Sequence, residues 1–283
     1  MKPDLGERSG RVALRTGTGL LVGLLLACLM VPFAAPKEVF DPLAQDMAEV
    51  LAPPNRSHWL GTDGLGRDVL ARVLHGGRQS LGAAALATVL ALALGASLGV
   101  FAASHRRWLS ESLARLTDVI NAFPALIGAL VLLGAGIDVF TRWPAAWSVG
   151  VAVGLFSWPP LFRYVRAEAL RWRESEWAES ARAVGAPSLR IALRHLLPAT
   201  LVPALIPAAF IAGGTILAEA GLGFIGFGSK PPAPTWGSLL LDAYRHVNEG
   251  AWWLMFFPGL ALFLTVLGTH LIGEGLRRRL THS

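Results

Sequence analysis

The chain has 283 residues, of which 53% are hydrophobic and 16% are charged, and its formal net charge is +6. An ordinary soluble domain carries about 25% charged residues, so this balance excludes a water-soluble globule. It also excludes intrinsic disorder, because a chain this apolar cannot keep its side chains in water. Cys28 is the only cysteine, and no Cys/His cluster has zinc spacing, which excludes disulfide-stapled and zinc-built folds. The remaining broad class is a membrane protein.

Six apolar segments follow one another along the chain. Each approaches the roughly 20 residues that a helix needs to cross the hydrocarbon core of a bilayer. The segments are too long for barrel strands and do not alternate with a period of two, which favours helices. The predicted fold is an all-α membrane protein with six transmembrane helices at 17–35, 81–104, 119–137, 145–162, 200–225 and 251–272. The fifth helix is the least regular, because it contains Pro203, Pro207 and Glu219.

An even number of spans places both termini on one side of the membrane. Most of the Lys and Arg residues fall on that side, and the positive-inside rule then predicts that both termini are cytoplasmic. The basic charge is therefore a topology signal and an attraction to anionic lipid head groups, with no need for nucleic acid. The expected organisation is a cytoplasmic tail (1–16), a first helix (17–35), an extracytoplasmic loop and elbow (36–80), a membrane core of five helices (81–276) that includes a cytoplasmic loop (163–199), and a cytoplasmic tail (277–283).

The start of the chain has a second interpretation. A basic beginning followed by an apolar stretch also occurs in cleaved secretory signals, and 25–28 resembles a lipoprotein cleavage box. Apolar residues continue past Cys28 to Phe33, and further spans follow. These features favour a first membrane helix that is retained.

The cytoplasmic loop has the pattern of a helix, a turn and a second helix. Residues 179–183 suit a short helix, and Gly185 offers a stop in the left-handed backbone conformation. Ser188 is expected to cap a second helix that runs to Pro198. The alternative is an amphipathic connector on the lipid surface, with its arginines among the head groups.

Three parts of this loop form a recognisable pattern: Glu179-Ser180-Ala181, then Gly185, then Leu197-Pro198. The spacing resembles the EAA loop of permease subunits in binding-protein-dependent ABC importers. Ser180 departs from the second alanine of the usual triplet, but it is small enough to preserve a helix contact. In that family the first short helix of the loop sits in a groove of the ATPase subunit and passes its closure to the membrane helices. The resemblance implies a coupling role for Glu179, Ser180, Ala181, Arg182, Gly185, Arg190, Leu197 and Pro198.

Further segments narrow the resemblance to permeases for dipeptides, oligopeptides and nickel. One matches the block before the second span and another matches the end of the fifth span. The matching segments are 58–72, 77–81, 218–228, 231–237, 257–260 and 273–277. They occur in the family's order and indicate its C-type subunit. The resemblance implies a type I ABC importer permease fold that works with a second homologous permease, two ATP-binding subunits and an extracytoplasmic substrate-binding protein.

The segment before the second span also has a structural logic of its own. Asp63 can accept hydrogen bonds from the free amides of a turn, as can Thr62, and the neighbouring glycines permit tight backbone. Asp68 and Arg72 are four residues apart, which predicts an ion pair on a helix. The sequence therefore predicts an ordered elbow that is either a structural clamp or a contact for the binding protein. Its candidate residues are Gly61, Thr62, Asp63, Gly66, Arg67 and Asp68.

Glu219 is the ionisable residue singled out within a predicted span. A carboxylate near the outer end of a membrane helix is costly unless it meets a partner or water. Glu219 is therefore a candidate for the translocation path or the outer gate. The alternative is a salt bridge or a capping interaction that fixes the end of the helix.

No phosphate-binding GxxxxGK[ST] loop occurs in the sequence, and no nucleophile–base or metal-ligand constellation is visible. The chain is therefore expected to be neither an enzyme nor a cofactor-binding protein, with ATP and Mg²⁺ bound by partner ATPase subunits. The predicted function is the permease subunit of an ATP-driven importer of di- or oligopeptides in the cytoplasmic membrane of a prokaryote. The alternatives are the same type of importer for nickel or glutathione, and a self-sufficient transporter driven by an ion gradient.

Overall fold

The computed structural model describes residues 5–34, 41–135, 145–228 and 232–281. Within these ranges the regular structure is helical, apart from one isolated bridge between Thr62 and Asp68, which confirms the predicted all-α fold. The elements in chain order are α1 (Leu5–Ala34), α3 (Val69–Ser104), α4 (Arg107–Ala122), α5 (Ala125–Gly134), α7 (Ala145–Ser157), α8 (Pro159–Arg173), α9 (Glu176–Ala183), α10 (Ser188–Ile191), η1 (Ala192–Leu196), α11 (Leu197–Phe224), α12 (Trp236–Arg245), η2 (Val247–Glu249) and α13 (Trp253–Thr281).

Four helical segments are long and apolar enough to cross a membrane by themselves. They are Arg8–Met30, Val69–Ser104, Ser188–Phe224 and Trp253–Leu280. Two further candidate spans are bent pairs, in which α4 meets α5 at 80° and α7 meets α8 at 44°. With each pair counted as one span, the described residues hold up to six, the number that the sequence predicts.

Prolines explain why the third and fourth spans are not straight helices. Phe123, which precedes Pro124, has an extended backbone with φ −93° and ψ 126°, so α4 ends before it. Pro159 begins α8 directly after α7 ends at Ser157. Proline lacks the amide that would continue the preceding helix, so both breaks fall where the ring interrupts the hydrogen-bond ladder. Residues 136 and 137 of the third predicted span lie outside the described residues.

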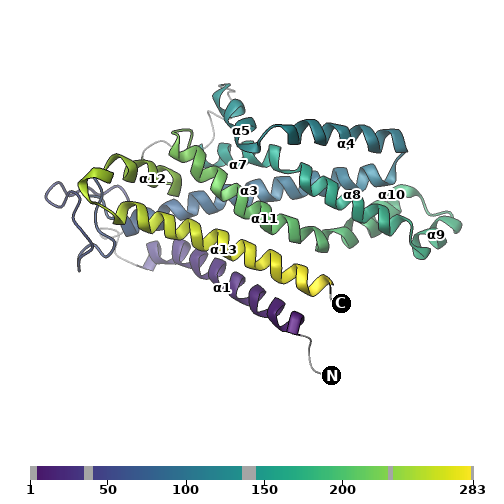
Figure 1. Ribbon diagram of the computed structural model, residues 1–283, viewed down its shortest axis with the longest axis horizontal. Helices are drawn as coiled ribbons and strands as arrows, with labels where there is room; N and C mark the ends of the chain where they lie inside the picture. The colour runs from purple at the N-terminus through teal and green to yellow at the C-terminus, as the bar shows by residue number, and fades with distance from the viewer. Residues whose placement is uncertain (1–4, 35–40, 136–144, 229–231, 282–283) are drawn as a thin grey trace.

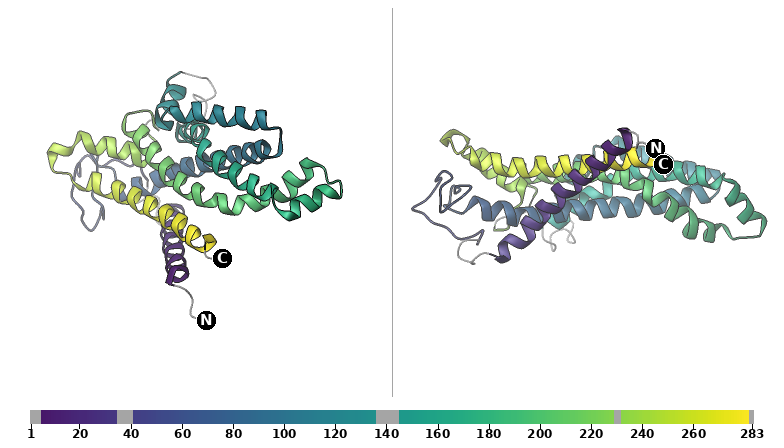
Figure 2. Two further views of the ribbon diagram at one scale, coloured as in Figure 1. Left: turned by 45° about the vertical axis from the view of Figure 1, so that its right-hand side comes forward. Right: turned by 90° about the horizontal axis from the view of Figure 1, so that it is seen from below.

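The helices form an elongated bundle whose two ends differ (Figure 1). Residues 41–68 and α12 lie at one end, and α9 lies at the other. The long α3 runs between the two ends and packs against α7, α8 and α11. Figure 2 shows α1 beside α13, and in Figure 1 the start of α1 and the end of α13 lie toward the α9 half of the molecule.

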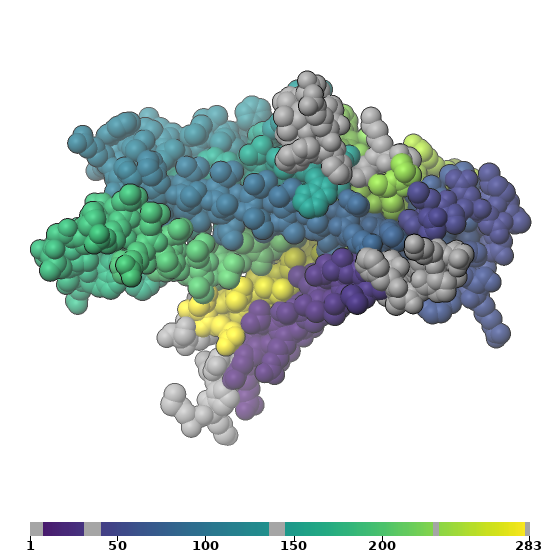
Figure 3. Space-filling model, turned by 180° about the vertical axis from the view of Figure 1, so that it is seen from behind, coloured from purple at the N-terminus to yellow at the C-terminus, as the bar shows by residue number. Residues whose placement is uncertain are grey.

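Glycines allow several of these helices to approach closely. A Cβ atom on Gly95 of α3 would lie 2.5 Å from Cβ of Leu161 in α8. A Cβ atom on Gly17 of α1 would lie 2.6 Å from the carbonyl oxygen of Gly268 in α13. Figure 3 shows α1 and α13 projecting together from the flank of the bundle, which is the arrangement that this contact requires. Small residues at a crossing bring two membrane helices nearer than larger side chains permit.

Candidate functional site

The predicted helix–turn–helix is present at the α9 end of the bundle. The first helix, α9, has Ala178 buried and Ala181 packed against the core formed by α3, α8 and α11. Gly185 has φ +80°, the left-handed conformation that the sequence predicts. The amide of Gly185 donates to the carbonyl of Arg182 at 2.9 Å, and the amide of Ala186 donates to that of Ala181 at 3.1 Å. The turn that ends α9 is therefore a hydrogen-bonded C-cap.

The outward face of α9 is polar and accessible. Glu179 and Ser180 are exposed, and so is Arg190 beyond the turn. Arg182 uses a guanidinium nitrogen to donate to the carbonyl of Arg173 at 2.9 Å, which ties α9 to the end of α8. Glu179 and Ser180 therefore remain accessible to a partner, although the Ser180 hydroxyl donates to the carbonyl of Glu176 at 2.9 Å, while Arg182 is held against α8.

The second helix of the loop differs from the prediction. Ser188 is the first helical residue of α10, and Pro187 occupies the N-cap position with no side-chain cap. The helix does not end at Pro198, because α10 continues through the π turn η1 into α11, and 188–224 is one continuous segment. A π turn is wider than an α turn, so it can accommodate the proline ring that follows it. Leu197 and Pro198 therefore begin a membrane helix.

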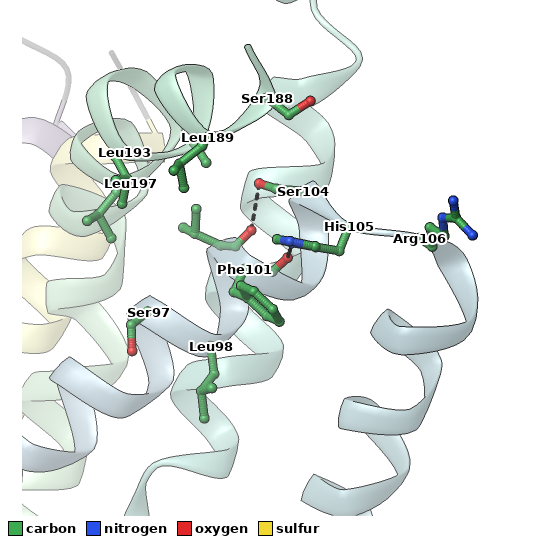
Figure 4. A pocket seen from close by; sticks show the side chains of 12 residues that line it. Ser97, Leu98, Phe101, Ser104, His105, Arg106, Ser188, Leu189, Leu193 and Leu197 are labelled. Atoms are coloured by element: carbon green, nitrogen blue, oxygen red, sulfur yellow. Dashed lines mark hydrogen bonds between the residues drawn. The ribbon is translucent and has the colours of Figure 1, made fainter.

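A pocket of about 910 Å³ separates this second helix from the end of α3 (Figure 4). Apolar side chains from both helices line it, namely Leu98, Phe101, Leu189, Leu193 and Leu197. Its polar rim is fixed locally, because Ser104 donates to the carbonyl of Val100 at 2.8 Å and the Nδ1 atom of His105 lies 2.8 Å from the carbonyl of Phe101. On this side α10 and η1 border open space instead of the surface of α3.

The predicted elbow lies at the opposite end of the bundle. Gly61 and Gly66 have φ of +79° and +70°, so both supply the left-handed turns for which glycine is suited. Thr62 is buried, and its hydroxyl oxygen accepts the amide of Ala52 at 2.8 Å. The indole nitrogen of Trp253, at the start of α13, donates to the carbonyl of Thr62 at 3.0 Å. The elbow is thereby attached to the last membrane helix.

Asp63 is the centre of the ion pairs in the elbow. Its Oδ1 atom accepts the amides of Leu65 at 2.9 Å and Arg67 at 3.0 Å, which confirms the predicted turn. Its Oδ2 atom accepts the Arg67 guanidinium at 2.7 Å and pairs with Arg72 of α3. Arg72 also lies 3.3 Å from the carboxylate of Asp242 in α12. These contacts join the elbow, α3 and α12.

The charge on Asp63 is stabilised by its surroundings. Burial raises the pKa of Asp63, but the charge of Arg72, the amides of Leu65 and Arg67, and the charge of Arg67 outweigh burial and hold that pKa below its ordinary value. A buried carboxylate with this number of donors stays ionised and holds its partners in place. The geometry accordingly favours a structural clamp.

The predicted ion pair between Asp68 and Arg72 is wrong. Asp68 is the N-cap of α3, where its carboxylate accepts the amide of Ala71 at 2.8 Å and lies 2.8 Å from Nδ1 of His58. A carboxylate at the start of a helix accepts hydrogen bonds from the free amides there. Arg72 therefore pairs with Asp63 and Asp242 and not with Asp68. Asp242 was not predicted as a partner, since 170 residues separate it from Arg72 and no local pattern links the two.

Glu219 lies between the two ends, within α11 and near α12. Its side chain is 1% exposed, and its polar neighbours are the hydroxyl groups of Ser80 in α3 and Thr235 at the start of α12. The nearby N-terminus of α12 is held to α3 by Trp236, whose amide donates to the Ser80 hydroxyl at 3.1 Å and whose indole donates to the Val73 carbonyl at 2.9 Å. Glu219 thus lies in a closed interface between helices, and no salt bridge to it is present in the described part of the chain.

Comparison with known proteins assigns the chain to a family. A model of the binding-protein-dependent transport system inner membrane component matches residues 95–282. The chain belongs to this family. The matched region includes α9, the Gly185 turn and every described helix from the second half of α3 to α13. The protein is accordingly a multi-pass inner-membrane component of such a transport system.

Several relatives match this chain over most of their own length. A Brucella suis protein provisionally named as a peptide transport system permease is 39% identical over 267 residues, which cover 94% of this chain and 86% of that protein. A Brucella ovis protein provisionally named as a peptide permease is 38% identical over 265 residues, covering 92% and 84%. The dipeptide transport system permease protein DppC of Alkalihalophilus pseudofirmus is 34% identical over 264 residues, covering 91% and 83%.

Proposed function

We propose that this chain is the permease subunit that carries peptides through an ATP-driven importer. The observation that carries the proposal is the geometry of the loop at the α9 end. A short helix with an accessible polar face is capped by the Gly185 turn, and the following helix is continuous with a membrane span. A force applied to α9 by an ATPase subunit would therefore reach α11 through a rigid connection.

Charge supports a cytoplasmic position for α9. Its neighbouring segments carry many guanidinium groups, and the positive-inside rule places such segments in the cytoplasm. The start of α1 and the end of α13 point to the same half of the molecule, so both termini are assigned to the cytoplasm as well. The elbow and α12 then lie on the extracytoplasmic side, where a substrate-binding protein would dock.

The names of the relatives support a peptide cargo, since they include peptide and dipeptide permeases. The proposed assembly contains a second permease subunit, two ATP-binding subunits and an extracytoplasmic substrate-binding protein. ATP and Mg²⁺ would be bound by the ATP-binding subunits. In the described residues no group of three or more His, Cys, Asp or Glu side chains could hold a metal ion.

The test is purification of the tagged chain with its stoichiometric partners, followed by uptake of labelled dipeptide into proteoliposomes that contain the assembly and its binding protein. We expect uptake with ATP, no uptake with a non-hydrolysable ATP analogue, and no effect of a protonophore. Uptake that needs a proton gradient and ignores ATP would contradict the proposal. Uptake of Ni²⁺ or glutathione in place of peptide would overturn the cargo but leave the ATP-driven mechanism.

A further inference from the structure

The charged residues of α4 lie along one of its faces. Glu111, Arg115 and Asp118 are separated by four and three residues, the spacing that places side chains on the same side of a helix. Asp118 pairs with Arg163 of α8, so the two helices together carry a charged stripe made of these four residues. The apolar side of α4, made of Trp108, Leu116, Val119 and Phe123, is exposed and adjoins the stripe about a quarter turn around the helix, with Val119 at the border because it follows Arg115 by four residues.

The contacts of α8 with α3 show how deep this stripe lies. A Cβ atom on Gly95 of α3 would lie 2.5 Å from Cβ of Leu161, and one on Gly99 would lie 3.0 Å from the amide nitrogen of Arg166. Arg163 is therefore level with residues 95–99 of α3. Residues 79–104 of α3 carry no charged side chain, and the middle of that stretch is near Ala91.

At about 1.5 Å per residue, the pair of Arg163 and Asp118 lies roughly 5–11 Å from the middle of the uncharged stretch. Half of the hydrocarbon core is about 15 Å thick, so the pair lies within the depth of the lipid tails. Yet 51% of the Arg163 side chain and 62% of the Asp118 side chain are exposed. Exposed charges at this depth are too costly to face lipid, and they mark water-filled cavities or pathways.

We propose that the stripe of Glu111, Arg115, Asp118 and Arg163 lines the cytoplasmic half of the translocation path, while the apolar side of α4 faces lipid. This assignment rests on the proposed function, because it takes the opposite wall of the path from a second permease subunit. Guanidiniums and carboxylates alternate along α4 at Arg107, Glu111, Arg115 and Asp118, and the presence of both signs of charge suits a zwitterionic cargo with an amino and a carboxyl group.

The test compares neighbouring positions at matched depth in the assembled complex. Single cysteines are introduced as Arg115→Cys and Asp118→Cys on the stripe, with Leu116→Cys, which lies between them in the sequence, as the control on the apolar side. A membrane-impermeant thiol reagent is added to inside-out vesicles, and its rate of reaction with this chain is measured. The native Cys28 is 1% exposed, so the unsubstituted chain serves as the blank.

We expect the stripe cysteines to react at least about tenfold faster than the Leu116→Cys control, because the reagent attacks the thiolate and needs water. Equal rates at the stripe and at Leu116→Cys, or faster reaction at Leu116→Cys, would overturn the assignment. The labelling pattern does not depend on the cargo or on ATP. If the labelling pattern is as expected but peptide uptake fails, only the proposed function is refuted. If peptide uptake succeeds but the stripe cysteines react no faster than the control, only the position of the stripe in the path is refuted.

Discussion

The indole nitrogen of Trp253 donates a hydrogen bond of 3.0 Å to the carbonyl oxygen of Thr62, and both residues are buried. The bond joins the first residue of α13 to the elbow. A carbonyl left without a donor in a closed environment costs free energy, so this bond holds the elbow to α13, in addition to the ion pairs of Asp63 that hold it to α3.

Trp253→Phe is expected to destabilise the elbow. Phenylalanine retains an aromatic ring but cannot donate, and an unsatisfied buried acceptor costs about 1–3 kcal/mol. The measurement is thermal unfolding of the detergent-solubilised complex, with protease cleavage within 41–68 as a local probe. The control is Trp252→Phe, since Trp252 is 59% exposed and should tolerate the change. Equal effects of the two substitutions would show that the hydrogen bond does not matter.

Asp63→Asn is expected to destabilise the protein by about 3 kcal/mol at neutral pH, because it leaves Arg72 buried with less compensating charge. The folded-state pKa of Asp63 is below its unfolded value of about 3.9, so its ionisation contributes stability that is present above that value and lost as the pH falls through the folded-state pKa. The difference in unfolding free energy between the two proteins should therefore shrink as the pH falls below about 4. A difference that stays constant would argue against this linkage.

Gly185→Val is expected to leave the protein inserted in the membrane but to uncouple ATP hydrolysis from uptake. A β-branched residue is poorly suited to φ +80°, and the left-handed conformation costs roughly 1–2 kcal/mol for a residue with a side chain. The measurements are the amount of assembled complex, its ATPase activity and dipeptide uptake. Gly214→Val is the control, because a Cβ there would meet no atom within 4 Å. Full uptake by Gly185→Val would refute the role of the turn.

Gly237→Val is expected to separate α12 from α11. Even a Cβ atom on Gly237 would lie 2.5 Å from the carbonyl oxygen of Ala220, and overpacking of this kind costs about 1–3 kcal/mol. The readout is the rate of disulfide formation between cysteines placed in α11 and α12, together with the melting temperature of the complex. The control is Gly259→Val, because a Cβ atom on Gly259 would meet no atom within 4 Å. Gly250 also lies in open space, but its φ of +75° would strain any side chain. An unchanged crosslinking rate would contradict the close contact.

Much of the fold follows from patterns that act over short distances. Runs of about 20 apolar residues locate spans, and the preference of glycine for positive φ locates the turns at Gly61, Gly66 and Gly185. The side chain of Asp63 accepts the amides within its own turn, as its position in the sequence predicts. Each of these features depends on a few neighbouring residues.

The parts that could not be predicted depend on distant partners. Arg72 has a carboxylate four residues before it, but the partners it uses are set by the N-cap of α3 and by the position of α12. The helix that continues through Pro198 was predicted to stop there, because the π turn that relieves the proline has no local signature. The charged stripe on α4 could not be predicted either, since the predicted third span begins after Asp118 and the pairing of Asp118 with Arg163 depends on how α8 packs.

The contact between Gly17 and Gly268 has a consequence for how the protein is made. The ribosome produces α1 first and α13 last, and these two helices lie side by side. The glycine-containing face of α1 therefore has no contact with α13, its principal neighbour, until α13 has been synthesised. The bundle can therefore be completed only after α13, the last of the described helices to be synthesised, packs against α1, the first of them.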